Sequence, residues 1–395
     1  MEELKELKKE AADVLEHNIF SFWMDKMVDE ENGGFLGRIT GDNVVLHSAD
    51  KGSVLNARIL WTFSAAFRVM RNPRYFAMAK RAKEYLIEKF IDKEFGGVYW
   101  TVNYQGHPSE TKKQIYALSF AIYGLSEYYR ATQDDEALKI ACELFHSIEK
   151  YSFDSGKNGY LEAFTRDWQL IDDMRLSEKD ANEQKTMNTH LHILEAYTNL
   201  YRVWKDELLE NQLKNLIELF LDKIIDSQTH HLRLFFDADW NNKSVAVSFG
   251  HDIEASWLLH EAAVALGNAE LLDKVQKTVP LIVEAAKSGL LPDGSMAYER
   301  VIETAHLDNE RHWWVQAEAV VGFLNHYQQY NDEQSLSKAL VCWEYIKKNL
   351  IDWGNGEWHW SIHSDGSVNR AEDKAGIWKC PYHNGRMCME IMERF

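Results

Sequence analysis

The chain has 395 residues, of which 45 % are hydrophobic and 27 % are charged, so it has enough apolar surface to fold and is not mainly disordered. The formal net charge of −18 argues against nucleic acid and against an anionic membrane surface as partners, because both bind basic proteins. Only 5 prolines and 21 glycines interrupt the chain, which favours long helices.

Apolar residues recur with helical spacing along almost the whole chain. The first predicted helix spans residues 2–27, with Leu4, Leu7, Ala11 and Val14 on one face. Five helix pairs and one last helix follow in chain order: 51–70 with 75–90, 113–130 with 135–151, 187–204 with 208–225, 253–266 with 269–287, 313–330 with 333–350, and 383–395. Since the last helix can pair with the first, we expect about twelve helices in six hairpins.

Glycines between the helix pairs mark a repeat. Steps of 63, 63, 135 and 62 residues separate the marker glycines Gly33, Gly96, Gly159, Gly294 and Gly356. The long step is about two periods, and its midpoint lies near the apolar, strand-like run 230–236, which has no glycine. Six units of this period account for nearly the whole chain.

A ring of six helical hairpins closes when its last helix packs beside its first. The sequence therefore predicts an all-α fold, an (α/α)6 barrel with an inner ring, an outer ring and short aromatic β-turn segments at its mouth. An open helical solenoid is the alternative, but the aromatic turn segments favour the wall of a mouth. No linker or break in composition divides the chain, so we expect a single catalytic domain over residues 1–395.

The cysteines and the N-terminal segment indicate the compartment. No CxxC motif occurs, and the cysteines are scattered: Cys142, Cys342, Cys380 and Cys388. This pattern is typical of reduced thiols in a cytoplasmic protein. The first five residues lack the basic start and apolar run of a signal peptide, and no apolar stretch approaches the length of a membrane span. We therefore expect a cytoplasmic protein without a membrane segment.

Histidines are concentrated at predicted helix starts. Three segments carry them: residues 188–195, 250–254 and 378–386. In the first segment, Asn188, His192 and Glu195 are four and three residues apart and share one helix face. His251 and His383 stand where their helices begin. Because these helix starts are expected at one end of the barrel, the histidines are predicted to face the mouth.

This set of side chains favours proton transfer on a sugar. Histidine takes and gives protons near neutral pH, and aromatic rings stack on the apolar faces of sugars. Arg58, on a predicted inner helix, can stabilise negative charge that develops on a sugar oxygen. The stacking candidates are Tyr116, Trp257, Tyr298, Trp313, Trp314 and Trp378. The pattern predicts proton abstraction next to a carbonyl.

Two other chemistries compete with proton transfer. Glycoside hydrolysis normally uses two carboxylates, and Asp180, Glu254 and Glu299 are candidates that leave it open. A zinc site at His190 and His192 is disfavoured because the two side chains point to different helix faces. No His-Glu-x-x-His motif or cysteine cluster supports a metal, so none is expected.

Eight segments in order carry a resemblance to a known family: NGGFLG (32–37), KGSVLNAR (51–58), GGVYW (96–100), TKKQIYA (111–117), NTHLH (188–192), SFGHDIE (248–254), HWWVQAE (312–318) and WKCPYH (378–383). They resemble the N-acylglucosamine 2-epimerase superfamily, and more closely its cellobiose 2-epimerase branch. The resemblance covers nearly the whole chain.

The resemblance implies a fold, an activity and a set of roles. It implies an (α/α)6 barrel that converts the reducing-end glucose of β-1,4-linked disaccharides to mannose without a metal or organic cofactor. It makes His251 and His383 the acid/base pair and His192 a third essential histidine. It places these residues at the substrate: Arg58, Tyr116, Asn188, Glu254, Glu299, Trp314 and Trp378, with Asp180 and Tyr298 matching less closely.

Alternatives remain open at this point. The same superfamily includes monosaccharide 2-epimerases for N-acylglucosamine or mannose, and aldose–ketose isomerases, in which the enediol is reprotonated at C1. An (α/α)6 glycoside hydrolase and a carbohydrate-binding toroid without catalysis belong to other classes. No glycine-rich phosphate loop is present, so we do not expect the nucleotide regulator that N-acylglucosamine enzymes often bind.

Overall fold

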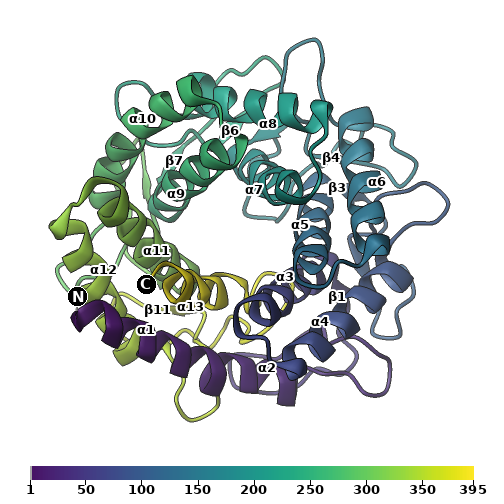
Figure 1. The fold of residues 1–395 in the computed structure, drawn as a ribbon, viewed down its shortest axis with the longest axis horizontal. Helices are drawn as coiled ribbons and strands as arrows, with labels where there is room; N and C mark the ends of the chain where they lie inside the picture. The colour runs from purple at the N-terminus through teal and green to yellow at the C-terminus, as the bar shows by residue number, and fades with distance from the viewer. Residues whose placement is uncertain (1) are drawn as a thin grey trace.

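The computed structural model describes residues 2–395 as two concentric rings of helices (Figure 1). The inner ring consists of α3 (Ser53–Met70), α5 (Ile115–Thr132), α7 (Met187–Val203), α9 (Phe249–Leu266), α11 (Trp313–Tyr330) and α13 (Tyr382–Arg394). The outer ring consists of α1 (Glu2–Val14) with α2 (Ser21–Lys26), α4 (Pro73–Tyr85), α6 (Asp135–Tyr151), α8 (Glu207–Leu219), α10 (Ala269–Lys287) and α12 (Glu333–Tyr345). Each outer helix packs on an inner one, so the predicted (α/α)6 barrel is confirmed.

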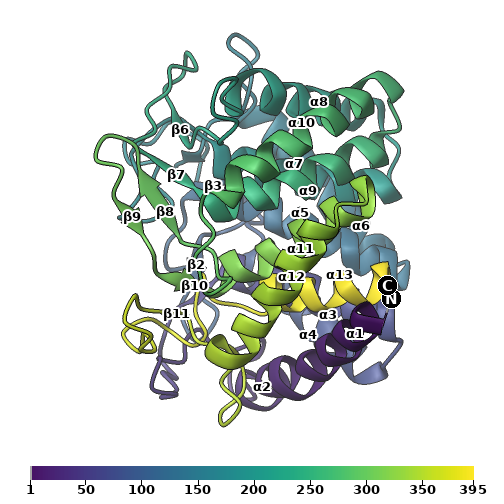
Figure 2. The ribbon, with the colours of Figure 1, turned by 90° about the vertical axis from the view of Figure 1, so that its left-hand side faces the viewer.

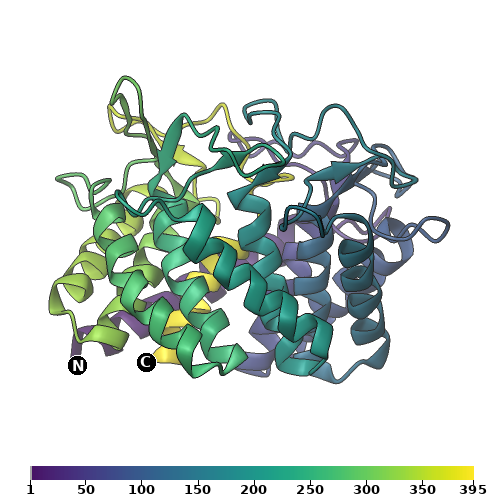
Figure 3. The same ribbon diagram turned by 90° about the horizontal axis from the view of Figure 1, so that it is seen from above.

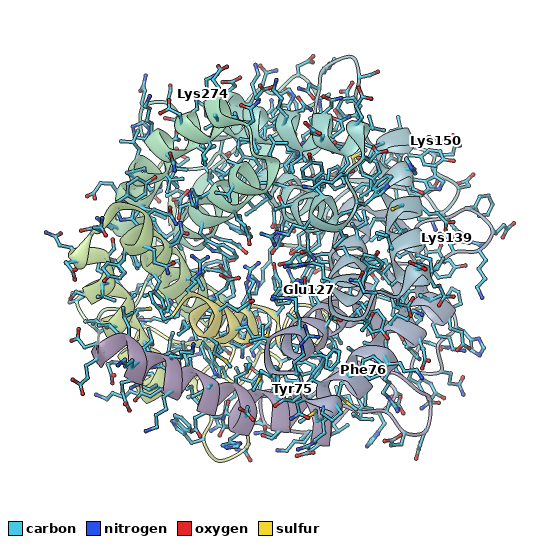
Figure 4. The ribbon with its side chains drawn as sticks, viewed as in Figure 1. Tyr75, Phe76, Glu127, Lys139, Lys150 and Lys274 are labelled. Carbon is cyan, nitrogen blue, oxygen red and sulfur yellow. The ribbon has the colours of Figure 1, made fainter. Side chains whose placement is uncertain are left out.

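The two rings differ in how their helices are buried. The inner helix α3 is buried on every face from Ser53 to Ala66, because it lies between the outer ring and the barrel interior. The outer helix α6 buries one stripe, Ala137, Ala141, Leu144, Phe145 and Ile148, at the spacing of an amphipathic helix. Figure 4 shows the result: Glu127 of α5 lies toward the centre, and Lys139, Lys150 and Lys274 lie on the outer rim.

The ring is closed by the two ends of the chain. Helix α13 packs between α11 and α3, and α1 covers it from outside, as predicted. The termini lie side by side at the end of the barrel opposite the strands (Figures 2 and 3). Within residues 2–395, no helix combines the length and apolar character needed to cross a membrane. All four cysteines lie within these residues, and none of them forms a disulfide.

Short antiparallel strands gather at the other end and form the mouth (Figure 3). They are β1 (Lys51–Gly52), β2 (Thr101–Val102), β3 (Lys113–Gln114), β4 (Ala163–Phe164), β5 (Lys185–Thr186), β6 (Phe235–Phe236), β7 (Ala246–Ser248), β8 (Glu299–Val301), β9 (Leu307–Asp308), β10 (Arg311–His312) and β11 (Ser361–Ile362). Their pairs are β1–β2, β3–β4, β5–β6 and β10–β11, and β7, β8 and β9 form one sheet. Five inner helices directly follow a strand, so the sheets fix where those helices start at the mouth.

One turn recurs where outer helices lead to the mouth, and it explains the glycine repeat. In the second unit, one carboxylate oxygen of Asp92 accepts hydrogen bonds from the backbone N–H groups of Glu94 and Phe95, at 3.1 and 3.3 Å. The fourth residue after the aspartate, Gly96, then has a φ of 74°. In the unit whose glycine is missing from the repeat, His230 occupies this position with a φ of 60°.

The second oxygen of the turn aspartate binds a buried lysine beside the next inner helix or the mouth. The pairs are Asp29–Lys51, Asp92–Lys113, Asp154–Lys185 and Asp352–Lys374, with N–O distances of 2.7, 2.8, 2.9 and 2.5 Å. Each lysine side chain is at most 1 % exposed. These ion pairs join the repeat turn of one unit to the start of the following unit. They were not predicted from the sequence.

Helix boundaries differ from the predicted ones in two ways. The helix expected from residue 253 begins at Phe249, so His251 lies in its first turn. Residues 51–52 and 113–114 are strands, because each pairs with the neighbouring unit. Four outer segments contain π-helical turns, η1 (Leu15–Phe20), η2 (Leu86–Phe90), η3 (Phe220–Ile224) and η4 (Ile346–Leu350), which widen helices predicted as regular.

Candidate active site

A cavity of about 730 Å³ opens at the strand end of the barrel. Every inner helix contributes to its wall. All twelve side chains that the sequence assigned to catalysis or to the substrate line it: Arg58, Tyr116, Asp180, Asn188, His192, His251, Glu254, Tyr298, Glu299, Trp314, Trp378 and His383. The closed ring thus brings residues up to 325 positions apart in the sequence into one cavity.

The cavity has a buried floor and a half-exposed mouth. Arg58, Tyr116, His192, Glu254 and His383 form the floor, and none of them is more than 6 % exposed. The half-buried Asp180, Tyr298, Glu299, Trp314 and Trp378 lie around it toward the solvent. A polar reacting group on the floor would therefore be shielded from bulk water, and an attached unit would reach the mouth.

His383 is held by a carboxylate on the neighbouring inner helix. Its Nδ1 lies 2.7 Å from Oε1 of Glu318, whose Oε2 accepts a hydrogen bond from the indole of Trp257 at 3.0 Å. With Nδ1–H donating to the carboxylate, Nε2 is the atom left to exchange a proton with a ligand. Burial, reinforced by the cations Arg58 and Arg386, holds the pKa of His383 well below its usual range.

His192 has the same kind of support within one helix. Its Nδ1 lies 2.9 Å from Oε2 of Glu195, three residues further along α7. The imidazole is 5.0 Å from the ring of Tyr116 and 4.7 Å from that of Phe120, measured between centroids. Burial lowers its pKa, so the ring is neutral at pH 7 and its Nε2 can accept a proton.

His251 has a neutral partner instead. Its Nδ1 lies 2.8 Å from Oγ of Ser248, the last residue of β7, and the ring centroid is 4.7 Å from that of Trp314. Desolvation lowers the pKa of His251 to about 3. The direct partner of His251 is thus a hydroxyl, whereas His192 and His383 each contact a carboxylate.

Arg386 occupies the centre of a buried acidic cluster beneath the histidines. It contacts Oε1 of Glu195, and its Nη2 lies 2.7 Å from both Glu254 and Glu318. Burial next to Glu318 raises the pKa of Glu254 well above its usual range. Ligand atoms of Glu254, Glu318 and His383 lie within 4.8 Å of one another, as a metal site would require. The guanidinium already bridges the two carboxylates, however, and fills the role of a cation there.

Arg58 differs from Arg386 in having neutral neighbours. Its Nη2 donates to the hydroxyl of Tyr116 at 2.7 Å, and its Nη1 lies 4.0 Å from Sγ of Cys380. The guanidinium lies over the rings of Phe120 and Tyr382, at 4.1 and 4.8 Å from their centroids. It is thereby fixed in position on the cavity floor with its positive charge available to a ligand.

The expectation for Trp257 needs correction, whereas that for His190 is confirmed. Trp257 was a stacking candidate, but it is 1 % exposed and supports Glu318 behind the cavity wall. His190 faces away from the cavity: its Nδ1 lies 2.6 Å from the carbonyl of Thr186, and its Nε2 accepts a hydrogen bond from the backbone of Tyr160. His190 therefore joins the turn at Tyr160 to α7. Its side chain lies on a different helix face from His192, as predicted.

The residues that support the histidines were not predicted from the sequence. Ser248 and Glu318 lie inside the segments that carried the resemblance, but no role was assigned to either. A signal was present for Glu318, which is four residues after Trp314 and therefore on the same face of α11. Arg386 gave no such signal, because its three partners are 68 to 191 residues away. The mouth also holds the unassigned side chains Asp308, Glu310, His312, Trp360, Asn369 and Glu372.

Comparison with known proteins identifies the family of this chain. The family described as N-acylglucosamine 2-epimerase (GlcNAc 2-epimerase) matches residues 34–385. The chain belongs to this family. A cellobiose 2-epimerase of Bacteroides fragilis is 60 % identical over 386 residues, covering 98 % of each chain. One of Ruminococcus albus is 41 % identical over 392 residues, covering 99 % of this chain and 98 % of its own.

A solved structure extends the similarity to three dimensions. The cellobiose 2-epimerase from Bacillus thermoamylovorans B4167 superimposes with a TM-score of 0.95 at 43 % identity. The match covers 99 % of this chain and 100 % of the other. The family relationship and the (α/α)6 fold thus agree with what the sequence motifs implied.

Proposed function

We propose that this family member is a cellobiose 2-epimerase, which interconverts glucose and mannose at the reducing end of β-1,4-linked disaccharides such as cellobiose and lactose. The observation that carries the proposal is the arrangement of His192, His251 and His383 around one shielded floor beside Arg58. The identity of 60 % to the cellobiose 2-epimerase of Bacteroides fragilis supports the choice of substrate.

The reaction begins with opening of the sugar ring. A closed pyranose has no carbonyl, so protons must first move between O1 and O5. The resulting aldehyde acidifies the C2–H bond. We assign the acid/base work to His251 and His383, as the family resemblance implies; both line the cavity, and each has Nδ1 engaged by the protein, which leaves Nε2 for a ligand.

Inversion then requires the proton to leave and return on opposite faces. One histidine removes the C2 proton and leaves a cis-enediolate, whose negative charge Arg58 and His192 stabilise. The proton returns from the other face after rotation about C2–C3, or from the second histidine. Because the pKa of both histidines is lowered, either ring is neutral at pH 7 and can accept a proton, although their partners differ: Glu318 for His383 and Ser248 for His251.

The mouth would bind the second sugar. Trp314 and Trp378 present aromatic faces to the cavity, and we assign Trp378 to the non-reducing unit. Tyr116, Asp180, Asn188, Glu254, Tyr298 and Glu299 would hydrogen-bond hydroxyl groups around the substrate. We further propose that residues 1–395 act as one cytoplasmic domain, without a metal or organic cofactor.

A panel of sugars tests the proposal. The purified protein is incubated with cellobiose, lactose, glucose, mannose and N-acetylglucosamine, and the products are separated. We expect glucosyl-mannose from cellobiose and little change in the monosaccharides. Turnover of mannose to fructose would favour the isomerase alternative, and release of two glucose molecules from cellobiose would favour a hydrolase. In heavy water, deuterium is expected at C2 of the product.

A further inference from the structure

Arg58 is a buried cation without an acidic partner. Eight lysine and arginine side chains in residues 2–395 are buried. Seven of them lie within 4.0 Å of a carboxylate: Lys51, Lys83, Lys113, Lys185, Lys374, Lys379 and Arg386. Arg58 is 3 % exposed and has none. Since burying an unpaired charge is costly, its place on the cavity floor suits an anionic group of a ligand.

The contacts of Arg58 leave its hydrogen-bonding capacity incomplete. Nη2 donates to the hydroxyl of Tyr116 at 2.7 Å, Nη1 lies 4.0 Å from Sγ of Cys380, and the buried Nε has no hydrogen-bond partner. Both partners are neutral, because burial raises the pKa of the phenol and of the thiol. The planar guanidinium therefore retains its charge, and not all of its N–H donors are used by the protein.

A carboxylate fits this position better than any neutral group of a sugar. In the proposed reaction the anion is a transient enediolate on O1 and O2. An aldonic acid carries two planar oxygens on C1 and keeps its charge permanently. Its sugar chain is open, as the reacting intermediate must be. Such a ligand would meet Arg58 with a bidentate pair of charge-assisted hydrogen bonds.

We propose that the cavity also binds open-chain disaccharide aldonates, with the C1 carboxylate on Arg58, and that these acids are competitive inhibitors. This inference rests on the proposed function, because it takes the disaccharide subsites from it. The mouth carries an opposing charge, from Glu178, Asp180, Glu299, Asp308, Glu310 and Glu372. Solvent screens the charges of those half-exposed or exposed carboxylates, but it does not screen the buried charge of Arg58 on the floor. We therefore expect Arg58 to decide whether a charged or a neutral ligand binds more tightly.

Two ligands isolate the effect of charge. Cellobionate and cellobiitol share the same linkage and open chain and differ in whether C1 is a carboxylate or an alcohol. Calorimetric titration of the wild-type protein is expected to give at least about tenfold tighter binding of cellobionate, as one charge-assisted contact provides. Equal or weaker binding of cellobionate, or no binding of either compound, overturns the inference.

Variants then locate the charge. Arg58→Gln is expected to remove the preference for cellobionate while changing the affinity for cellobiitol less. Lys179→Gln is the matched control, because Lys179 is the other permanently charged cation of the cavity wall and is exposed. A preference that survives Arg58→Gln overturns the inference, and one that Lys179→Gln abolishes places the anion at the wrong cation. The wild-type comparison stands even where Arg58→Gln does not fold.

The same measurements keep this inference separate from the proposed function. Neither ligand has a reducing end, so binding is measured without turnover. A protein that binds cellobionate preferentially but leaves cellobiose unchanged contradicts the proposed function alone. A protein that epimerises cellobiose but binds the two ligands equally contradicts the aldonate inference alone.

Discussion

At the scale of single residues, His251 and His383 have contacts that suit proton transfer. Replacing either by alanine leaves the barrel intact, because each ring faces the cavity, and should lower kcat with cellobiose by about a hundredfold or more. Steady-state rates, together with melting curves that show a folded protein, check this. His107→Ala, at an exposed turn, is the control histidine. Near-normal rates for either cavity variant would remove that residue from the acid/base pair.

The lowered pKa values of the cavity histidines predict a pH profile. Burial lowers the pKa of His192, His251 and His383, and a base with a lowered pKa stays unprotonated as the pH falls. Activity should therefore persist below pH 6.5 and be lost only near the lowered values. The acid limb of kcat/KM, measured between pH 4 and 9, is expected at a midpoint below about 5.5. A midpoint at 6.5 would indicate an exposed histidine.

The site residues could be found from the sequence only where local patterns carry information. His192, His251 and His383 were found because each lies at a helix start within a recognisable segment. Their supporting partners Glu318 and Arg386 were missed, since the contacts form across the ring between helices far apart in sequence. Trp257 was misplaced because an inner helix is buried on all sides, so an aromatic residue there need not face the cavity.

At the scale of elements, the repeated turn depends on buried ion pairs. Asp92→Asn keeps the oxygen that accepts the backbone N–H groups but removes the charge beside the fully buried Lys113. Leaving that ammonium unpaired should lower the free energy of unfolding by about 3 kcal/mol or more, which urea unfolding measures. Glu270→Gln, which removes an exposed pair with Lys274, is the control and should change stability by less than about 1 kcal/mol.

Helix positions were more predictable than the segments that join them. Six hairpins followed from apolar periodicity and marker glycines, because the repeat imposes the same φ angle at the same place in most units. His230 was not recognised as the turn position of its unit, because it adopts the positive φ angle without being a glycine. Short β segments at the mouth were predicted, but their pairing and the aspartate–lysine pairs were missed, because both join neighbouring units. The aspartate and lysine of a pair are 21 to 31 residues apart.

At the scale of the whole molecule, Arg386 connects the last helix to three others. It contacts Glu195 of α7, Glu254 of α9 and Glu318 of α11, so one side chain ties α13 across the barrel interior. Arg386→Met would leave those carboxylates buried together without a cation. We expect the free energy of unfolding at pH 7 to fall by about 3 to 5 kcal/mol, together with loss of activity.

The pH dependence of that loss identifies its cause. Arg386 lowers the pKa of Glu195 and of Glu254, so both folded-state pKa values should rise in the variant. A group whose folded pKa exceeds its unfolded value favours folding as the pH decreases, because the folded state then binds more protons. The stability difference between wild type and Arg386→Met should therefore shrink from pH 8 to pH 5 in urea unfolding experiments. A difference independent of pH would instead indicate lost packing against the rings of Trp257 and Tyr382.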